Sequence, residues 1–288
     1  LKALASHATK CTFEVIVMDD VSSDLTPEII TKIDGVRYVR NEENLGFLRN
    51  CNKAAGLAKG SYLVFLNNDT VVLPGWLDAL YDTFAQFPAV GLAGSKLIFP
   101  DGRLQEAGGI IWNDASGWNW GRLSSPDHPR FNYVRDADYV SGASIMIERQ
   151  LFEVLGRFDE RYAPAYYEDT DLAFAVREKG YRVIYQPRSA VVHFEGVSSG
   201  TDLSSGVKRY QVVNQAKFFN KWKHVLAAHG RAEDNPARSA DRRYDKHVLI
   251  VDAVTPTPDQ DSGSVDMLNL IRILLDLGWR VHFVPQTN

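Results

Sequence analysis

A short polar triplet, Asn67-Asn68-Asp69, follows the apolar run at 62–66 and precedes a predicted helix at 76–86. The strand-forming residues of the run predict that the triplet lies at the carboxyl end of a strand. Carboxylate and amide oxygens at such a turn suit a hard divalent cation such as Mg2+ or Mn2+, which prefers oxygen ligands and is usually shared with substrate phosphates. Asn and Asp also end strands as ordinary turn formers, so the triplet acquires meaning only from its surroundings.

Further polar clusters carry side chains capable of acid–base or ligand chemistry. They are Asp19-Asp20, the segment Asn44-Leu45-Gly46-Phe47 with Arg49 and Asn52, the run Tyr167-Glu168-Asp169-Thr170-Asp171, and His193 at the end of a predicted strand.

The elements that must position these clusters alternate between strand and helix. Strands are predicted at 13–18, 36–40, 62–66 and 90–93, and helices from Pro27, at 47–58 and at 76–86, with Thr26 as N-cap before Pro27. Strands separated by helices of this length imply an α/β fold with a mostly parallel central sheet flanked by helices. Ligands bind such sheets at the carboxyl ends of the strands, where the loops 19–24 and 67–70 are expected.

The second half of the chain predicts a long excursion at 100–136, followed by strands at 139–147, 181–186 and 190–193. A mobile loop is expected at 195–206 and a long helix at 207–228. Residues 230–245 carry many charges and few large apolar side chains, which is typical of a linker. We therefore expect a first domain over 1–229, a linker over 230–245, and a βαβ fragment over 246–288.

Composition restricts the partners and the compartment. Of the 288 residues, 45% are hydrophobic and 24% charged, and the net charge of -4 gives no support to nucleic-acid binding. No apolar run approaches the roughly 20 residues that span a bilayer. Cys11 and Cys51 lack CxxC spacing and indicate reduced thiols. The sequence predicts a cytoplasmic protein without a transmembrane segment, compatible with peripheral association at the inner face of the membrane.

Taken in order, these motifs resemble the inverting glycosyltransferases of family 2, which have the GT-A nucleotide-sugar-binding fold. The resemblance covers roughly residues 12–205 and is carried by Glu14-Val15-Ile16-Val17-Met18-Asp19-Asp20 with Ser22 and Asp24, Asn44-Leu45-Gly46-Phe47, Phe65-Leu66-Asn67-Asn68-Asp69-Thr70, Ser141-Gly142-Ala143, Glu168-Asp169-Thr170-Asp171-Leu172, Gly180-Tyr181 and His193. It implies an enzyme that moves a sugar from a UDP- or dTDP-sugar donor to a hydroxyl of a glycan or lipid-linked acceptor.

The resemblance also implies roles for individual residues. Asp20 would accept the ring N–H of uracil or thymine, and Gly46 would allow a close backbone approach. Arg49 would meet a base or phosphate, although a solvated helix face explains it nearly as well. The residues assigned to the nucleotide are Asp19, Asp20, Asn44, Gly46, Arg49 and Asn68.

For the chemistry, the resemblance places Asp69 on the Mn2+ or Mg2+ ion that bridges the diphosphate, with Asn67 replacing the first Asp of the family's Asp-x-Asp motif. His193 matches a further metal ligand of some relatives, but a lone His that ends a strand is also often structural. Asp169 resembles the general base that takes the proton of the acceptor hydroxyl. The alternative for this cluster is an acid that caps the helix, which suits Glu168 or Asp171 better.

Three further expectations remain. Trp112, Trp118 and Trp120 could stack on a sugar, but at least one of them is expected in the core. The first strand of the family is not found before residues 13–18, which leaves a hydrophobic sheet edge there. Residues 246–288 resemble the opening of a GT-B glycosyltransferase domain.

The alternative functions are a non-catalytic nucleotide-sugar-binding or scaffold module, favoured by Asn67 and the missing strand, and a nucleotidyltransferase. The latter ranks last because the Gly-rich phosphate loop that it needs is not found.

Overall fold

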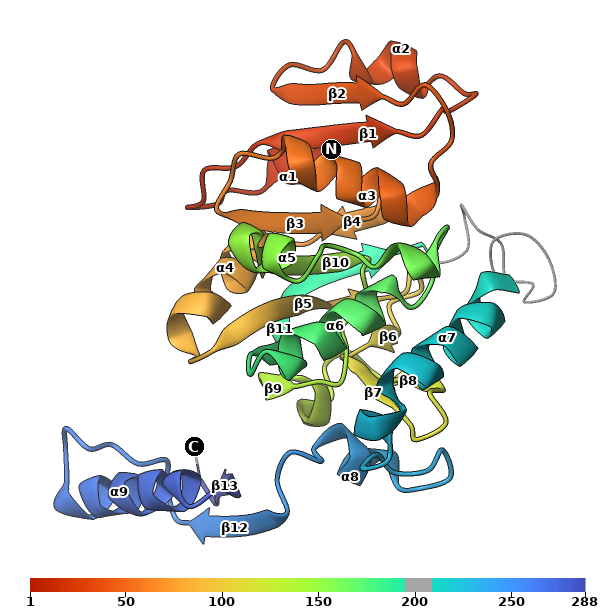
Figure 1. Ribbon diagram of the computed structural model, residues 1–288. Helices are drawn as coiled ribbons and strands as arrows, with labels where there is room; N and C mark the ends of the chain where they lie inside the picture. Colours follow the sequence, from red (N-terminus) through yellow and green to blue (C-terminus); the bar gives the residue numbers. More distant parts are fainter. Residues whose placement is uncertain (195–208, 288) are drawn as a thin grey trace. The chain divides into compact units, whose positions relative to one another are not determined.

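The computed structural model describes residues 1–194 and 209–287 and divides the chain into two compact units, Leu1–Ala240 and Asp241–Asn288 (Figure 1). The loop expected at 195–206 lies outside the described residues.

The first unit contains the elements that position all the candidate site residues. Three of them, β2, β3 and α4, match the predicted ranges at both ends. In chain order, its elements are α1 (Lys2–Ser6), β1 (Val15–Asp19), α2 (Thr26–Ile30), β2 (Val36–Arg40), α3 (Gly46–Leu57), β3 (Tyr62–Leu66), β4 (Thr70–Val72), α4 (Trp76–Gln86), β5 (Val90–Ile98), β6 (Leu104–Glu106), β7 (Gly109–Ile111), β8 (Gly117–Asn119), β9 (Arg135–Asp136), β10 (Ser144–Glu148), α5 (Arg149–Val154), α6 (Glu168–Glu178), β11 (Arg182–His193), α7 (Arg209–Leu226) and α8 (Pro236–Ala240).

The central sheet has seven strands, with the path β3-β10-β5-β11-β4 and with β6 and β9 added on β5 and β11. Strand β11 runs parallel to β5, but β10 runs antiparallel to both of its neighbours, β3 and β5. The sheet is therefore mixed, whereas the sequence predicts a mostly parallel one. Strand β10 starts at the end of the sheet where β5 finishes, so the excursion at 100–136 leaves and re-enters the sheet at the same end, and no periodicity in the sequence encodes that return.

Strands β1 and β2 form a separate parallel pair. Among the described residues, β1 pairs only with β2 and β3 only with β10, so no backbone ladder joins the two sheets. Four of the five residues of β1 are half-buried, and Phe13 just before it is 47% exposed. The apolar edge expected at 13–18 is thus partly covered.

Helices cover both faces of the central sheet, as the alternating pattern predicts. Side chains of β3 alternate between the two faces: Leu63 and Phe65 join one hydrophobic cluster, and Val64 packs against the other. The first cluster includes residues of α3, α5, α6 and α7, and the second includes those of α4.

Helix α7 is fixed to α6 through a buried carboxylate. Asp171, which is 3% exposed, accepts hydrogen bonds from the Tyr162 hydroxyl (2.9 Å), Lys221 Nζ (2.8 Å) and Trp222 Nε1 (2.7 Å). The Asp171 carboxylate therefore holds α7 against α6. Because its oxygens accept hydrogen bonds from Tyr162 and from α7, it does not cap its own helix.

Much of the segment predicted as a linker packs on the first unit. Asn113 donates its N–H to the Gly230 carbonyl (2.9 Å), and Arg135 Nη1 donates to the Ala240 carbonyl at the end of α8 (2.9 Å). Despite its charged composition, the segment 230–245 therefore contains a short helix, α8, whose last carbonyl is hydrogen-bonded to the first unit.

The second unit is the predicted βαβ arrangement, with β12 (Lys246–Asp252) parallel to β13 (Trp279–Pro285) and α9 (Ser262–Asp276) between them. Asp261 caps α9 by accepting the Ser264 N–H (2.7 Å). None of the helices in the described parts of the chain combines the length and apolar character needed to cross a bilayer.

We expect Asp171→Ala to lower the free energy of unfolding by about 3 kcal/mol, because Tyr162 and Trp222 lose their buried acceptor and Lys221 loses a counter-charge. Chemical unfolding followed by tryptophan fluorescence measures the loss. Glu178→Ala, an exposed position on the same helix, is the matched control and should change stability by less than about 0.5 kcal/mol. Equal losses in the two variants would contradict the anchoring role.

Candidate active site

The first turn of α6 presents the Asp169 carboxylate to the segment that leads into β10. Asp169 Oδ2 accepts the Gly142 N–H (2.8 Å), and Oδ1 accepts the Thr170 N–H (2.6 Å). Burial raises the pKa of Asp169, while these backbone N–H groups oppose that rise by favouring the ionised form. Asp169 is thus a carboxylate held in a fixed orientation, with its proton affinity increased.

The loop that precedes α6 is held in a strained shape. Tyr166 and Tyr167 have φ angles of 74° and 73°, a region that non-glycine residues rarely adopt. The fully buried Asn214 Nδ2 on α7 donates to three carbonyls of this loop: those of Tyr162 (2.8 Å), Ala165 (2.9 Å) and Tyr166 (3.0 Å). Helix α7 therefore fixes the loop that aims Asp169, a role that the sequence pattern did not reveal.

Two buried glutamates lie within electrostatic range of Asp169. Burial, aided by the charge of Asp169, raises the pKa of Glu106 to about 8 and that of Glu168 to about 8. Glu106 Oε1 accepts the Ser141 N–H (3.0 Å), next to the amide that binds Asp169. With pKa values of about 8, both glutamates hold a proton near pH 7, whereas the backbone N–H groups on Asp169 favour its ionised form. Sequence reasoning missed Glu106 because a single Glu within an irregular excursion belongs to no motif.

Asp69 and His193 lie together where β4 and the end of β11 pair. His193 Nε2 is 3.3 Å from Asp69 Oδ1, a buried oxygen without a hydrogen-bond partner. His193 Nδ1 is 3.2 Å from Gln105 Oε1, an amide oxygen that can only accept, so Nδ1 carries the proton of the neutral ring. The lone pair of Nε2 then faces the carboxylate.

Two acceptors that face each other across 3.3 Å need a cation or a proton between them. A carboxylate oxygen and an imidazole nitrogen are suitable ligands for Mn2+, so these residues fit the expected ion. Gln105 accepts the Nδ1–H of the histidine and so fixes the direction of its ring, as acceptors behind metal-bound histidines do. Asn68 beside them is exposed.

Hydrogen bonds connect this pair to Asp169. The Asn67 N–H donates to the Ala143 carbonyl (3.0 Å), one residue beyond the amide that binds Asp169. Strand β6 reaches both ends of the site, because Gln105 contacts His193 and Glu106 contacts Ser141. Hydrogen bonds and strand β6 thus link the segments that carry Asp69, His193 and Asp169, which we call the Asp169 cluster.

Asp20, Asn44 and Gly46 contact one another at a second place, where β1 ends and α3 begins, which we call the Asp20 corner. Asp20 accepts the backbone N–H groups of Leu45 and Gly46 (2.8 Å each), and Asn44 Nδ2 donates to the Asp20 carbonyl (3.2 Å). Gly46 has φ 73°, and a Cβ there would lie 2.8 Å from Pro164 Cβ. The close approach expected at Gly46 is therefore made to the loop before α6, which places this corner next to Asp169's supporting segment.

Asp19 and Arg49 have protein partners of their own. Although burial opposes it, hydrogen bonds from Ser22 and Tyr38 and the charge of Arg40 lower the pKa of Asp19 to about 2. Asp19 thus remains ionised and joins β1 to β2. Arg49 Nε pairs with Glu160 (3.2 Å), and both side chains are more than half exposed, which matches the solvated-helix alternative.

Of the three tryptophans in the excursion, Trp112 (2% exposed) and Trp120 (7% exposed) belong to the core, as expected for at least one of them. Trp118 on β8 is 42% exposed, so it is the member of the trio with a face available to a ligand.

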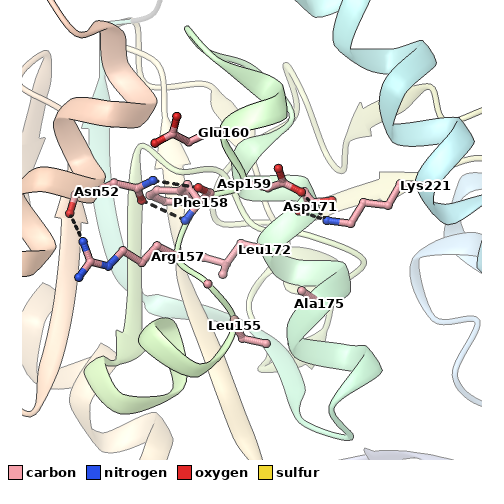
Figure 2. A pocket seen from close by; sticks show the side chains of 11 residues that line it. Asn52, Leu155, Arg157, Phe158, Asp159, Glu160, Asp171, Leu172, Ala175 and Lys221 are labelled. Carbon is pink, nitrogen blue, oxygen red and sulfur yellow. Dashed lines mark hydrogen bonds and ion pairs between the residues drawn. The ribbon is translucent and has the colours of Figure 1, made fainter.

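A cavity of about 400 Å³ opens on another side of α6 (Figure 2). Its lining includes Asn52, Asp159, Asp171 and Lys221 but not Asp69, Asp169 or His193. The polar groups are paired with one another: Lys221 bridges Asp159 (2.9 Å) and Asp171 (2.8 Å), and Asn52 binds the backbone of Phe158. This cavity is separate from the Asp169 cluster.

Comparison with known proteins identifies the family. The family model described as glycosyl transferase family 2 matches residues 1–155. The chain is 36% identical over 159 residues to the O-antigen biosynthesis protein RfbC of Myxococcus xanthus, covering 52% of this chain and only 12% of that protein. It is 28% identical over 227 residues to the N-acetylglucosaminyl-diphospho-decaprenol L-rhamnosyltransferase of Mycobacterium tuberculosis, covering 70% of this chain and 73% of that enzyme.

Among solved structures, the crystal structure of GalNAc-T7 with UDP, GalNAc and Mn2+ matches with a TM-score of 0.57 at 18% identity, covering 75% of this chain and 44% of that one. This likeness concerns the fold, which is the GT-A fold of glycosyltransferases. The chain belongs to glycosyl transferase family 2, as the motifs predict. The GT-B resemblance of residues 246–288 stays a prediction.

Glu106→Gln should become more stable relative to the unchanged protein as the pH rises from about 5 to about 8. A carboxyl whose pKa is raised in the folded state stabilises the fold below its unfolded pKa, and this contribution is lost as the pH rises through the folded value of about 8. Gln has no such dependence. Denaturant unfolding at both pH values, with the exposed Glu178→Gln as control, measures the difference. A stability difference that does not change with pH would mean that Glu106 does not hold its proton.

Proposed function

We propose that this chain catalyses inverting transfer of a sugar from a nucleoside-diphosphate donor, UDP- or dTDP-linked, to a hydroxyl of a glycan or lipid-linked acceptor. The observation that carries the proposal is the cluster in which the Asp69–His193 pair and the oriented Asp169 carboxylate are joined through residues 67 and 141–143. An inverting sugar transfer needs a group that stabilises the departing diphosphate and, close to it, a base that takes the proton of the acceptor hydroxyl.

Asp169 is the base in this proposal. It takes the proton of the acceptor hydroxyl as the hydroxyl oxygen attacks the anomeric carbon and the bond to the diphosphate breaks. Its raised pKa increases its affinity for that proton, and the neutral state of Glu106 and Glu168 near pH 7 keeps neighbouring negative charge away.

Asp69 and His193 would hold the divalent ion, Mn2+ or Mg2+, which when bound offsets the negative charge on the departing diphosphate. With Asn67 in the first position of the triplet, Asp69 is the sole carboxylate ligand that the triplet supplies. Gln105 holds the His193 ring so that Nε2 stays directed at the site.

The nucleotide is proposed to occupy the corner of Asp20, Asn44 and Gly46, with Asp19, Arg49 and Asn68 around it. Because both Asp20 oxygens already accept backbone N–H groups, Asp20 would order the 44–46 segment as well as meet the base. The half-exposed Trp118 is the proposed platform for the acceptor sugar. The rhamnosyltransferase relative is named for a lipid-diphosphate-linked sugar, which supports an acceptor of this class and peripheral membrane association.

Asp69→Ala should weaken Mn2+-dependent binding of UDP or dTDP at least ~10-fold, because the ion loses its carboxylate ligand. Calorimetric titration of both nucleotides, with and without Mn2+, measures this change. The exposed Asp127→Ala is the control and should bind as the unchanged chain does. Unaltered metal-dependent binding by Asp69→Ala would remove Asp69 from the metal site.

Asp169→Asn should reduce the transfer rate roughly 10²- to 10⁴-fold, with little change in donor binding, because only the proton acceptor is lost. Release of nucleoside diphosphate in the presence of a panel of glycan and polyprenyl-linked acceptors measures the rate, with Glu178→Gln on the same helix as control. Intact transfer by Asp169→Asn would refute the catalytic assignment. Nucleotide binding without acceptor-dependent release by any form of the chain would favour the scaffold alternative, for which Asn67 is the supporting feature.

A further inference from the structure

The second unit contains a cluster of metal-ligating side chains that the transferase site does not use. Asp241, His247 and His282 place one ligand atom each within 4.8 Å of the others, and no other group of three such residues occurs in the described parts of the chain. All three belong to the same compact unit.

The two histidines face each other through their nitrogen atoms. His247 Nδ1 lies 3.2 Å from His282 Nε2, and His247 Nε2 lies 3.1 Å from the Tyr244 carbonyl oxygen. Because a carbonyl can only accept, Nε2 of His247 carries the proton of the neutral ring, and its lone pair is on Nδ1. The Tyr244 carbonyl thus orients His247 as carbonyls orient metal-bound histidines.

We propose that Asp241, His247 and His282 bind a divalent transition-metal ion of the zinc type. Two nitrogens that bind tetrahedral Zn2+ at about 2.0–2.1 Å lie roughly 3.3 Å apart, which is close to the observed separation. One carboxylate with two imidazoles is a ligand set for Zn2+, and it differs from the oxygen-rich sets that Mg2+ requires.

The topology explains why such an ion would matter. His247 is near the start of β12, His282 is within β13, and Asp241 precedes both strands. One ion would therefore join the two strands that α9 separates to the segment just before β12. The strand pair buries little by itself, since Leu249 is 64% and Val251 is 56% exposed. A small unit of this kind gains stability from a metal that binds only the folded form.

Two existing contacts compete with the ion. Arg280 Nε lies 3.4 Å from Asp241 Oδ2, and without a metal the two histidines can share a proton as an ordinary N–H···N hydrogen bond. Metal binding replaces that proton and turns the carboxylate from Arg280 towards the rings. The decisive question is therefore whether the histidine pair takes up a metal ion or only a proton.

The test is titration of the full chain with Co2+, whose visible absorption reports tetrahedral coordination, followed by displacement with Zn2+. We expect one equivalent to bind with an intense tetrahedral spectrum, and Zn2+ to raise the melting temperature. His282→Ala and Asp241→Asn should each weaken binding at least ~10-fold. His224→Ala, an exposed histidine outside the cluster, should bind as the unchanged chain does. Asp69→Ala should keep the tetrahedral Co2+ spectrum even though it loses the proposed transferase metal, which separates the two sites.

Absence of a tetrahedral Co2+ spectrum from the unchanged chain would overturn the proposal, leaving a hydrogen-bonded histidine pair. Equal binding by the unchanged chain, His282→Ala and Asp241→Asn would overturn it as well. Circular dichroism of the two variants establishes that the second unit is folded, and Asp241→Asn, which preserves side-chain shape, tests the site if His282→Ala unfolds.

Discussion

The hydrogen bond from the Gly142 N–H to Asp169 is the contact on which the candidate site depends. It joins the segment before β10 to the first turn of α6, and therefore ties the sheet to the helix that carries the proposed base. A backbone donor has fewer degrees of freedom than a side chain, so the carboxylate direction follows from the position of the sheet. The neighbouring amide of Ser141 is taken by Glu106, and the adjacent Ala143 carbonyl is taken by Asn67. Three consecutive residues thus connect the proposed base, a buried acid and the turn that carries the proposed metal ligand Asp69.

Burial and hydrogen bonding determine how readily Asp169, Glu106 and Glu168 each bind a proton. Desolvation acts on Asp169, Glu106 and Glu168 alike and raises the pKa of each. Asp169 differs because both of its oxygens accept backbone N–H groups, which stabilise the charge, whereas Glu168 Oε2 has no hydrogen-bond partner. The same burial therefore favours the neutral form of the two glutamates, while the backbone donors favour the charged form of Asp169. Environments that separate the pKa values of neighbouring acids are how enzymes assign acid and base roles to them.

The local sequence pattern was sufficient to predict those helices and strands that have a clear apolar face or end in turn-forming residues. The limits of β3 and α4 follow from an apolar run and a helix start, and the motif order identified the family and its GT-A fold. The direction of β10 and the positions of Gln105 and Glu106 did not follow, because they depend on how an irregular segment of some 37 residues leaves and re-enters the sheet. Asn214 was missed for a related reason: its three acceptors lie 48 to 52 residues away in the chain and are backbone atoms.

The strained loop before α6 explains why these long-range contacts matter. Positive φ at two consecutive tyrosines costs of order 1–3 kcal/mol per residue and persists only where the surroundings over-determine it. Asn214 supplies part of that constraint from α7, and Asp171 fixes α7 to α6. Gly46, in the segment bound by Asp20, packs against Pro164 of the loop. The orientation of Asp169 is consequently coupled to the packing of α7 on one side and to the Asp20 corner on the other. A donor that orders the 44–46 segment would therefore act on the same loop that aims the base, which links donor binding to base placement through direct packing contacts.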